Sequence, residues 1–285
     1  MSDSVVPDGG GQHGRGEPGG TVLVTGGTGV LGRAVVHQLR EHGRPVRVMS
    51  RRQREPGDEQ GCEWAVADLK SGSGIAGAVA GAAVIVHCAT AFGPGQEVAL
   101  TRRLVEAARA GGTPHLVHIS IVGVDRIPMN YYRAKLDSER LVEDSGPEHT
   151  ILRATQFHDL VREVLALAAR LPVMPLPRVS FQPIDVREVA TRLAELATGA
   201  PQGRVPDIGG PHVADVRQLA NSYLTATGRH RAQLPVRMPG GTFRALRQGH
   251  NLVPENAWGT VTFEDYLASH LAPAGLSYRA ARRPR

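Results

Sequence analysis

The sequence predicts an α/β fold, with a doubly wound parallel sheet, helices on both of its faces and a smaller C-terminal part. Three observations lead to this prediction. Strand-like and helix-like segments alternate through the first 155 residues, which is the pattern of consecutive βαβ units. A glycine-rich turn joins the first apolar run to the first helical one. Of the 285 residues, 41% are hydrophobic, enough for a sizeable core.

Each element follows from its local pattern. Short β-branched or continuous apolar runs predict strands, and apolar residues spaced three or four apart predict helices. The predicted strands span residues 21–25, 45–49, 62–66, 82–88, 114–120 and 150–154. The predicted helices span residues 30–39, 98–110, 131–143 and 156–171, and two more begin at Asp185 and Asp215, whose side chains suit helix caps.

The basic composition comes almost entirely from arginine. Only two of the 33 basic residues are lysines, and the formal net charge is +6. Four arginines lie in the last seven residues, so the rest of the chain carries +2. No basic stripe is visible, and we expect a solvated surface rather than a nucleic-acid interface.

The chain shows no pattern typical of membrane insertion or export. Its most apolar stretch, residues 76–92, is diluted by glycine and alanine and interrupted by His87. The first twenty residues lack the apolar centre of a secretory signal. Cys62 and Cys88 lie in apolar runs, as reduced packing residues do. We therefore expect a cytoplasmic protein.

A glycine-rich loop, Thr25 to Gly32, follows the first predicted strand and opens the first helix. Glycine allows the tight turn and lets the backbone approach a pyrophosphate, which the amino end of the helix then faces. The strand before the loop and the helix after it favour a dinucleotide site over a turn without a ligand. The expected binding residues are Gly26, Thr28, Gly29, Val30, Leu31 and Gly32.

The end of the second predicted strand indicates which dinucleotide binds. An NAD site usually places an acid there to bind the ribose 2′-hydroxyl. This strand instead ends in Ser50, Arg51 and Arg52. Guanidinium groups suit a 2′-phosphate, which they bind through paired charge-assisted hydrogen bonds. The sequence therefore predicts that NADP(H) is preferred over NAD(H).

Tyr131 and Lys135 are four residues apart and share one face of the helix after the fifth predicted strand. A nearby ammonium favours the phenolate, so the tyrosine becomes a usable proton donor or acceptor. Ser120, at the end of the preceding strand, is a candidate for holding a substrate carbonyl oxygen. These three residues are the predicted catalytic group.

These motifs resemble the short-chain dehydrogenases/reductases, in the atypical branch with the NmrA-like and other NAD(P)H-binding proteins. The resemblance covers residues 21 to about 160 and only loosely the remainder. It implies a Rossmann fold of about seven parallel strands, with the cofactor along the carboxyl edge of the sheet. This chain departs from the family at Ala89-Thr90-Ala91, where many members have an Asn-Ala-Gly type of segment. The spacing from Ser120 to Tyr131 is also slightly shorter than the usual family value.

The resemblance also assigns positions around the cofactor. Asp68 and Leu69 would flank the adenine, and Ala89 and Thr90 would border the cofactor ribose. Lys135 would hold the nicotinamide ribose. Thr155 would line the nicotinamide, with Gln156 and Phe157 on the substrate side.

Two other patterns receive structural interpretations. His115 and His118 lie three apart in a predicted strand, so they point to opposite faces, and no metal-binding motif accompanies them; we expect no metal. The apolar stripe Leu160, Val164, Leu167 and Leu171 is interpreted as core rather than as a partner surface. Helices of this fold do pair in dimers, so both a monomer and a homodimer stay open.

The chain is thus predicted to comprise a disordered glycine-rich tail at residues 1–20, a dinucleotide-binding core at 21–155 and a substrate-side part at 156–285. The predicted function is an NAD(P)H-dependent oxidoreductase. Hydride would pass to or from a carbonyl or conjugated small molecule, and Tyr131 would move the proton. The alternatives are a non-catalytic NADP(H) sensor that binds a regulatory partner, and a nucleotide-sugar epimerase or dehydratase.

Overall fold

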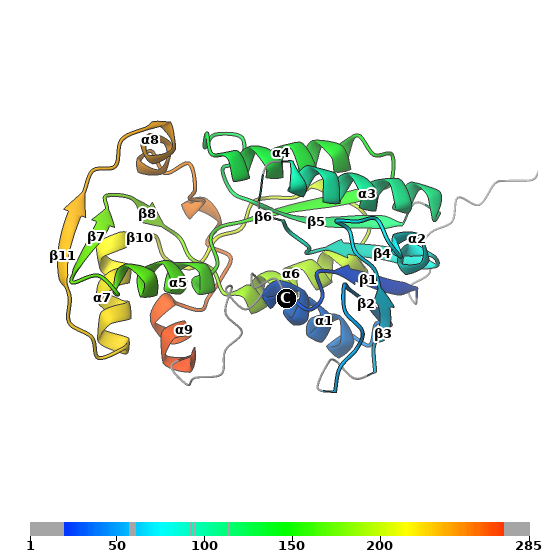
Figure 1. The fold of residues 1–285 in the computed structure, drawn as a ribbon, viewed down its shortest axis with the longest axis horizontal. Coiled ribbons are helices and arrows are strands. Elements are labelled where there is room, and N and C mark those ends of the chain that lie inside the picture. Colours follow the sequence, from blue (N-terminus) through cyan, green and yellow to red (C-terminus); the bar gives the residue numbers. More distant parts are fainter. Residues whose placement is uncertain (1–19, 57–60, 92, 94, 113, 271–285) are drawn as a thin grey trace, which may run out of the picture.

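The central sheet has seven strands, all parallel, in the order β3-β2-β1-β4-β5-β6-β9 (Figure 1). The computed structural model describes residues 20–56, 61–91, 93, 95–112 and 114–270. The strands are β1 Thr21–Thr25, β2 Val46–Ser50, β3 Glu63–Val66, β4 Ala82–His87, β5 His115–Ile121, β6 His149–Ala154 and β9 Gly203–Arg204. The predicted doubly wound α/β fold is confirmed.

Helices cover both faces of this sheet (Figure 1). One face carries α1 Val30–Glu41 and α6 Val186–Thr198. The other carries α2 Ile75–Val79, α3 Gln96–Ala110 and α4 Asn130–Glu143. The sequence did not predict α2, because this segment is short and rich in alanine and glycine and shows little apolar periodicity.

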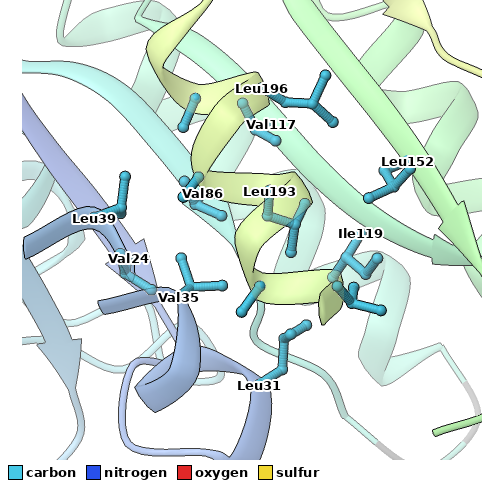
Figure 2. Packing of buried hydrophobic residues seen from close by; sticks show 14 of the residues in the cluster. Val24, Leu31, Val35, Leu39, Val86, Val117, Ile119, Leu152, Leu193 and Leu196 are labelled. Atoms are coloured by element: carbon cyan, nitrogen blue, oxygen red, sulfur yellow. The ribbon is translucent and has the colours of Figure 1, made fainter. Parts of the chain in front are cut away.

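Apolar side chains fill the space between α6, α1 and the sheet (Figure 2). Leu193 of α6 is fully buried among residues of α1 and the central strands. The strands here are covered on both faces, which explains their nearly continuous apolar sequences. Val86, Val117 and Leu152 all belong to this core.

The chain after β6 contributes both to the sheet and to a second group of elements. β9 and α6 complete the main sheet and its helical layer, although they come from beyond residue 155. The remaining elements pack beside it around a separate apolar cluster (Figure 1). They are α5 His158–Ala168, β7 Val173–Pro177, β8 Ser180–Phe181, β10 Ala214–Asp215, α7 Val216–Ala226, β11 Ala232–Val236, α8 Gly241–Arg247, the 3-10 turn η1 Pro254–Asn256 and α9 Phe263–His270.

The interpretation of the α5 stripe as core is wrong. Val164 and Leu167 are 58% and 53% exposed, whereas Val161 and Leu165 are buried. The helix is apolar on more than one face, and the face beginning at His158 packs against α7 and α9. Periodicity alone could not show which of two apolar faces the remainder of the chain would cover.

The described helices include none long and apolar enough to cross a membrane. The predicted tail lies outside the described residues except for Gly20, whose carbonyl oxygen accepts a hydrogen bond from the Arg44 guanidinium. Cys62 lies in the core around α1 and α6 and Cys88 packs against it, as expected of packing residues.

Replacing Leu193 by alanine is expected to lower the free energy of unfolding by about 2–5 kcal/mol, because the surrounding layers cannot close around the lost volume. Urea denaturation measures this change. Val164→Ala on the exposed face of α5 is the control, with an expected change within about 0.5 kcal/mol. Equal effects of the two substitutions would contradict the packing described for α6.

Candidate active site

The loop between β1 and α1 is shaped by close backbone approaches that only glycine permits. Gly26 has a φ of +65°, and a Cβ there would lie 2.8 Å from the Ala89 backbone after β4. A Cβ on Gly32 would lie 2.1 Å from the carbonyl oxygen of Gly26. The first turn of α1 therefore packs directly on the end of β1, as a dinucleotide-binding turn requires.

The amino end of α1 is suited to an anion. Gly29 caps the helix without any side-chain hydrogen bond, and the first turn contains no acid. Its backbone N–H groups and the helix dipole therefore favour a phosphate at this position. Arg33, which the sequence pattern did not mark as a site residue, donates to the Thr28 carbonyl oxygen at 3.1 Å and stabilises the loop. Leu31 points into the core, so only its backbone is placed to contribute.

At the tip of β2 the three predicted residues have different environments. Ser50 is buried, and its hydroxyl oxygen accepts a hydrogen bond from the backbone N–H of Arg52. Arg52 lies over the Trp64 ring at 5.8 Å and pairs with Glu55 at 3.5 Å. Arg51 is exposed. Of these two arginines, Arg51 is thus the more accessible to a ligand.

The neighbouring segment after β3 supplies Asp68 and Leu69. The Asp68 carboxylate accepts the backbone N–H of Lys70 at 2.9 Å. Although partial burial opposes ionisation, this hydrogen bond and the nearby charge of Arg51 hold the pKa of Asp68 below its usual value. Leu69 is buried in the core. Asp68 is therefore an ionised group on the same side of the edge as Arg51.

The four-membered network of Tyr131, Thr90, Glu97 and Lys135 lies at the carboxyl edge of the sheet, between α3 and α4. The Tyr131 hydroxyl lies 3.2 Å from Thr90 Oγ1, and Thr90 Oγ1 donates to Glu97 Oε2 at 3.0 Å. The other carboxylate oxygen of Glu97 lies 2.6 Å from Lys135 Nζ. The backbone N–H of Ala91 also donates to Glu97, at 2.7 Å. Tyr131 and Lys135 are thus brought to one site, as predicted from the sequence.

The sequence did not predict Glu97 as part of the site. An acid in the first turn of a helix is ordinary, and nothing in the local pattern marks this one as buried. In the structure Glu97 is completely inaccessible to solvent. The only available signal was chemical: Lys135 on an inward face needs a partner of opposite charge.

The electrostatics of the pair follow from burial and proximity. Burial alone would lower the pKa of Lys135, but Glu97 outweighs it and the pKa is raised. Burial would likewise raise the pKa of Glu97, yet Lys135 and the hydrogen bond from Ala91 leave it lowered. Both groups are therefore charged at neutral pH.

The remaining predicted residues lie around this network. Ser120 is buried at the end of β5, and its hydroxyl has no hydrogen-bond partner within the described part of the chain. Thr155 is buried and donates to the Gln182 carbonyl oxygen, so its hydroxyl is already committed to the protein. Gln156 donates to the Tyr132 hydroxyl at 3.5 Å, while Phe157 packs against the core.

Three polar residues lie side by side across the sheet beneath this site. The strand register pairs Thr25 with His87 and His87 with His118. His87 Nδ1 and Thr25 Oγ1 are hydrogen-bonded at 2.7 Å, and the two imidazole rings are 5.2 Å apart. His118 is fully buried, and neither of its ring nitrogens has a hydrogen-bond partner among the described residues. Both histidines are thus held neutral inside the protein.

The sequence profile of the NAD(P)H-binding family matches residues 26–179. This chain belongs to the NAD(P)H-binding family. The match contains the glycine loop, the tip of β2 and the tyrosine–lysine pair. It confirms the NAD(P)H-binding part of the resemblance drawn from the motifs.

Several known relatives of this NAD(P)H-binding protein are named as reductases. A (4-alkanoyl-5-oxo-2,5-dihydrofuran-3-yl)methyl phosphate reductase of Streptomyces griseus is 28% identical over 73% of this chain and 74% of its own. An NAD(P)H azoreductase of Xenophilus azovorans is 26% identical over 80% of this chain and 79% of its own.

Solved structures share the fold. An NADPH-dependent quinone oxidoreductase from Escherichia coli, complexed with NADPH, superimposes with a TM-score of 0.73 at 19% identity. The match covers 88% of this chain and 99% of that one. A nucleoside-diphosphate-sugar epimerase from Staphylococcus aureus has a TM-score of 0.74 at 18% identity, over 87% and 99% of the two chains.

Because of the buried histidines, we expect the free energy of unfolding to fall at acidic pH. Burial lowers the pKa of His87 from 6.5 to about 4 and that of His118 well below 6.5. Between pH 6.5 and about 4, these histidines bind protons in the unfolded chain but not in the folded protein. Their full contribution to the free energy of unfolding is therefore present above pH 6.5 and is lost as the pH falls toward 4. At about 1.4 kcal/mol per pKa unit, His87 alone accounts for a loss of about 3 kcal/mol.

Urea denaturation across this pH range measures the effect. His118→Leu should make the decline shallower, because it removes one group whose protonation is linked to unfolding. His230→Leu, at an exposed position, serves as the matched control and should leave the slope unchanged. A wild-type stability that is flat from neutral to mildly acidic pH would contradict the assignment.

Proposed function

We propose that the protein is an NADP(H)-dependent oxidoreductase that transfers hydride between the cofactor and a carbonyl or conjugated small molecule. The observation that carries this proposal is the linked group of Tyr131, Thr90, Glu97 and Lys135 at the carboxyl edge of the sheet. Ligands of open α/β sheets bind along this edge. The reductase names of the two relatives support a redox reaction.

The residues divide into binding and proton-moving roles. The loop from Gly26 to Gly32 and the amino end of α1 would bind the pyrophosphate. Asp68, Ala89 and Thr90 would border the remainder of the dinucleotide. Nicotinamide, when bound, supplies or accepts the hydride at its C4 atom. Tyr131 would exchange a proton with the substrate oxygen, and Lys135 would hold the nicotinamide ribose.

The substrate side is proposed to lie between the end of β5 and the described C-terminal part, residues 156–270. The Ser120 hydroxyl, which lacks a described partner, would bind the substrate oxygen. Tyr131 packs in an apolar cluster with Ile121 and with Leu246 of α8. These side chains form an apolar wall, which favours an apolar small molecule over a nucleotide sugar. The presence of both Tyr131 and Lys135 supports an enzyme over a non-catalytic sensor.

The preference for NADP(H) rests on Arg51. Arg51→Ala is expected to weaken NADPH binding by about 1.5–3 kcal/mol, the worth of a hydrogen bond to a charged group, and NADH binding little. Titration calorimetry with both cofactors measures this difference. Arg109→Ala, an exposed arginine at the end of α3, is the control for loss of surface charge. Equal affinity of the wild-type protein for NADH and NADPH would refute the preference.

The catalytic role rests on Tyr131. Tyr131→Phe keeps the ring in its apolar cluster but removes the proton, so turnover should fall by about 10²–10⁴-fold with cofactor affinity retained. NADPH oxidation over a panel of ketones, quinones and enones, with binding measured in parallel, tests this. Lys135→Ala should reduce both turnover and cofactor affinity.

Tyr132 provides the matched control for Tyr131. Its ring is buried and its hydroxyl contacts Gln156, away from the Thr90 and Glu97 network. Tyr132→Phe should therefore affect turnover far less. Unchanged turnover in Tyr131→Phe would exclude the proposed mechanism, and tight NADPH binding without turnover on any substrate would favour the sensor.

A further inference from the structure

The hydroxyl proton of Thr90 is already assigned by its neighbours. Glu97 is ionised, so its carboxylate only accepts hydrogen bonds. Thr90 therefore donates its single hydroxyl proton to Glu97, at 3.0 Å. With that proton committed, Thr90 Oγ1 can only accept from the Tyr131 hydroxyl 3.2 Å away. A phenol has a proton to give to this acceptor and a phenolate has none.

The charges around Tyr131 also favour the neutral phenol over the phenolate. An isolated ammonium at Lys135 would favour the phenolate, but the Glu97 carboxylate 2.6 Å from it cancels most of that field. Three buried titratable groups that interact with Lys135 are neutral at physiological pH. Burial lowers the pKa of His87 to about 4 and that of His118 well below 6.5, and raises the pKa of Cys88 to about 12. None of these three groups therefore adds a positive charge beside Tyr131.

We propose that Glu97 is a positioning residue which, through Thr90 and Lys135, holds Tyr131 as a neutral phenol, the form that can donate a proton to the substrate oxygen. This inference rests on the proposed oxidoreductase function and adds a residue that positions its proton donor. In reduction, the cofactor is oxidised as its hydride forms a bond to the substrate carbon. The Tyr131 O–H bond breaks, its proton passes to the substrate oxygen, and the phenolate regains a proton from solvent.

The ionisation of Tyr131 in the cofactor-free protein provides a direct test. The ultraviolet absorbance of tyrosinate is followed against pH in the full-length protein, and subtraction of the Tyr131→Phe titration isolates this residue. Glu97→Gln should lower its midpoint by about one to three pH units, because the ammonium of Lys135 is no longer compensated. The alkaline limb of kcat/KM for reduction should move to lower pH by the same amount.

Two further variants separate this role from a loss of folding. Thr90→Val, at an exposed position, should shift the Tyr131 midpoint in the same direction by a smaller amount, because it removes only the acceptor of the phenol. Glu139→Gln is the matched control, because it breaks a second buried ion pair, between Glu139 of α4 and Arg153. It should lower the melting temperature but leave the Tyr131 midpoint unchanged.

The outcomes are distinguishable. A Tyr131 midpoint that stays at its wild-type value in Glu97→Gln, or in Thr90→Val where Glu97→Gln does not fold, overturns the inference. An equal shift in Glu139→Gln overturns it too, since the effect would then be a general consequence of destabilisation. Full turnover of Tyr131→Phe would instead refute the proposed function, while the titration would still report on Glu97.

Discussion

The ion pair between Lys135 and Glu97 lies inside the protein, where the end of β4 meets α3 and α4. Neither charge would be tolerated there alone, because an unpaired buried charge has lost its hydration without compensation. Each partner therefore fixes the other, and Thr90, Ala91 and Tyr131 take their positions around the carboxylate. The chemistry proposed for the site depends on this mutual constraint.

Helix α4, which carries Lys135, has a second buried ion pair one turn further on. Glu139 of α4 receives two hydrogen bonds from Arg153 of β6, and Arg153 also reaches Asp125. The helix is thus anchored by charge to α3 at one point and to the sheet at the next. Buried pairs of this kind contribute little net stability. Any arrangement that separates the two partners is nevertheless strongly disfavoured, because it leaves a buried charge without compensation. The two pairs fix α4 against its neighbours, and only the Glu97 pair is linked, through Thr90, to the hydroxyl of Tyr131.

Parallel topology brings the separate parts of the site together. Each strand ends at the same edge, so the glycine loop after β1, the arginines after β2 and the Thr90 segment after β4 become neighbours. The close approach of Gly26 to Ala89 ties two of these segments directly. The C-terminal part then adds an apolar wall through α8. A polar network and an apolar wall at one edge are what binding a cofactor beside a small organic molecule requires.

Local sequence determined much of this protein. The glycine loop, the basic tip of β2 and the Tyr131–Lys135 spacing are short-range patterns whose geometry follows from one turn or one helix face, so they were predictable together with the α/β fold. The burial of Glu97, the exposure of Val164 on α5 and the commitment of the Thr155 hydroxyl to Gln182 were not. Each depends on which surface a distant segment covers, and that is decided only when the whole chain packs.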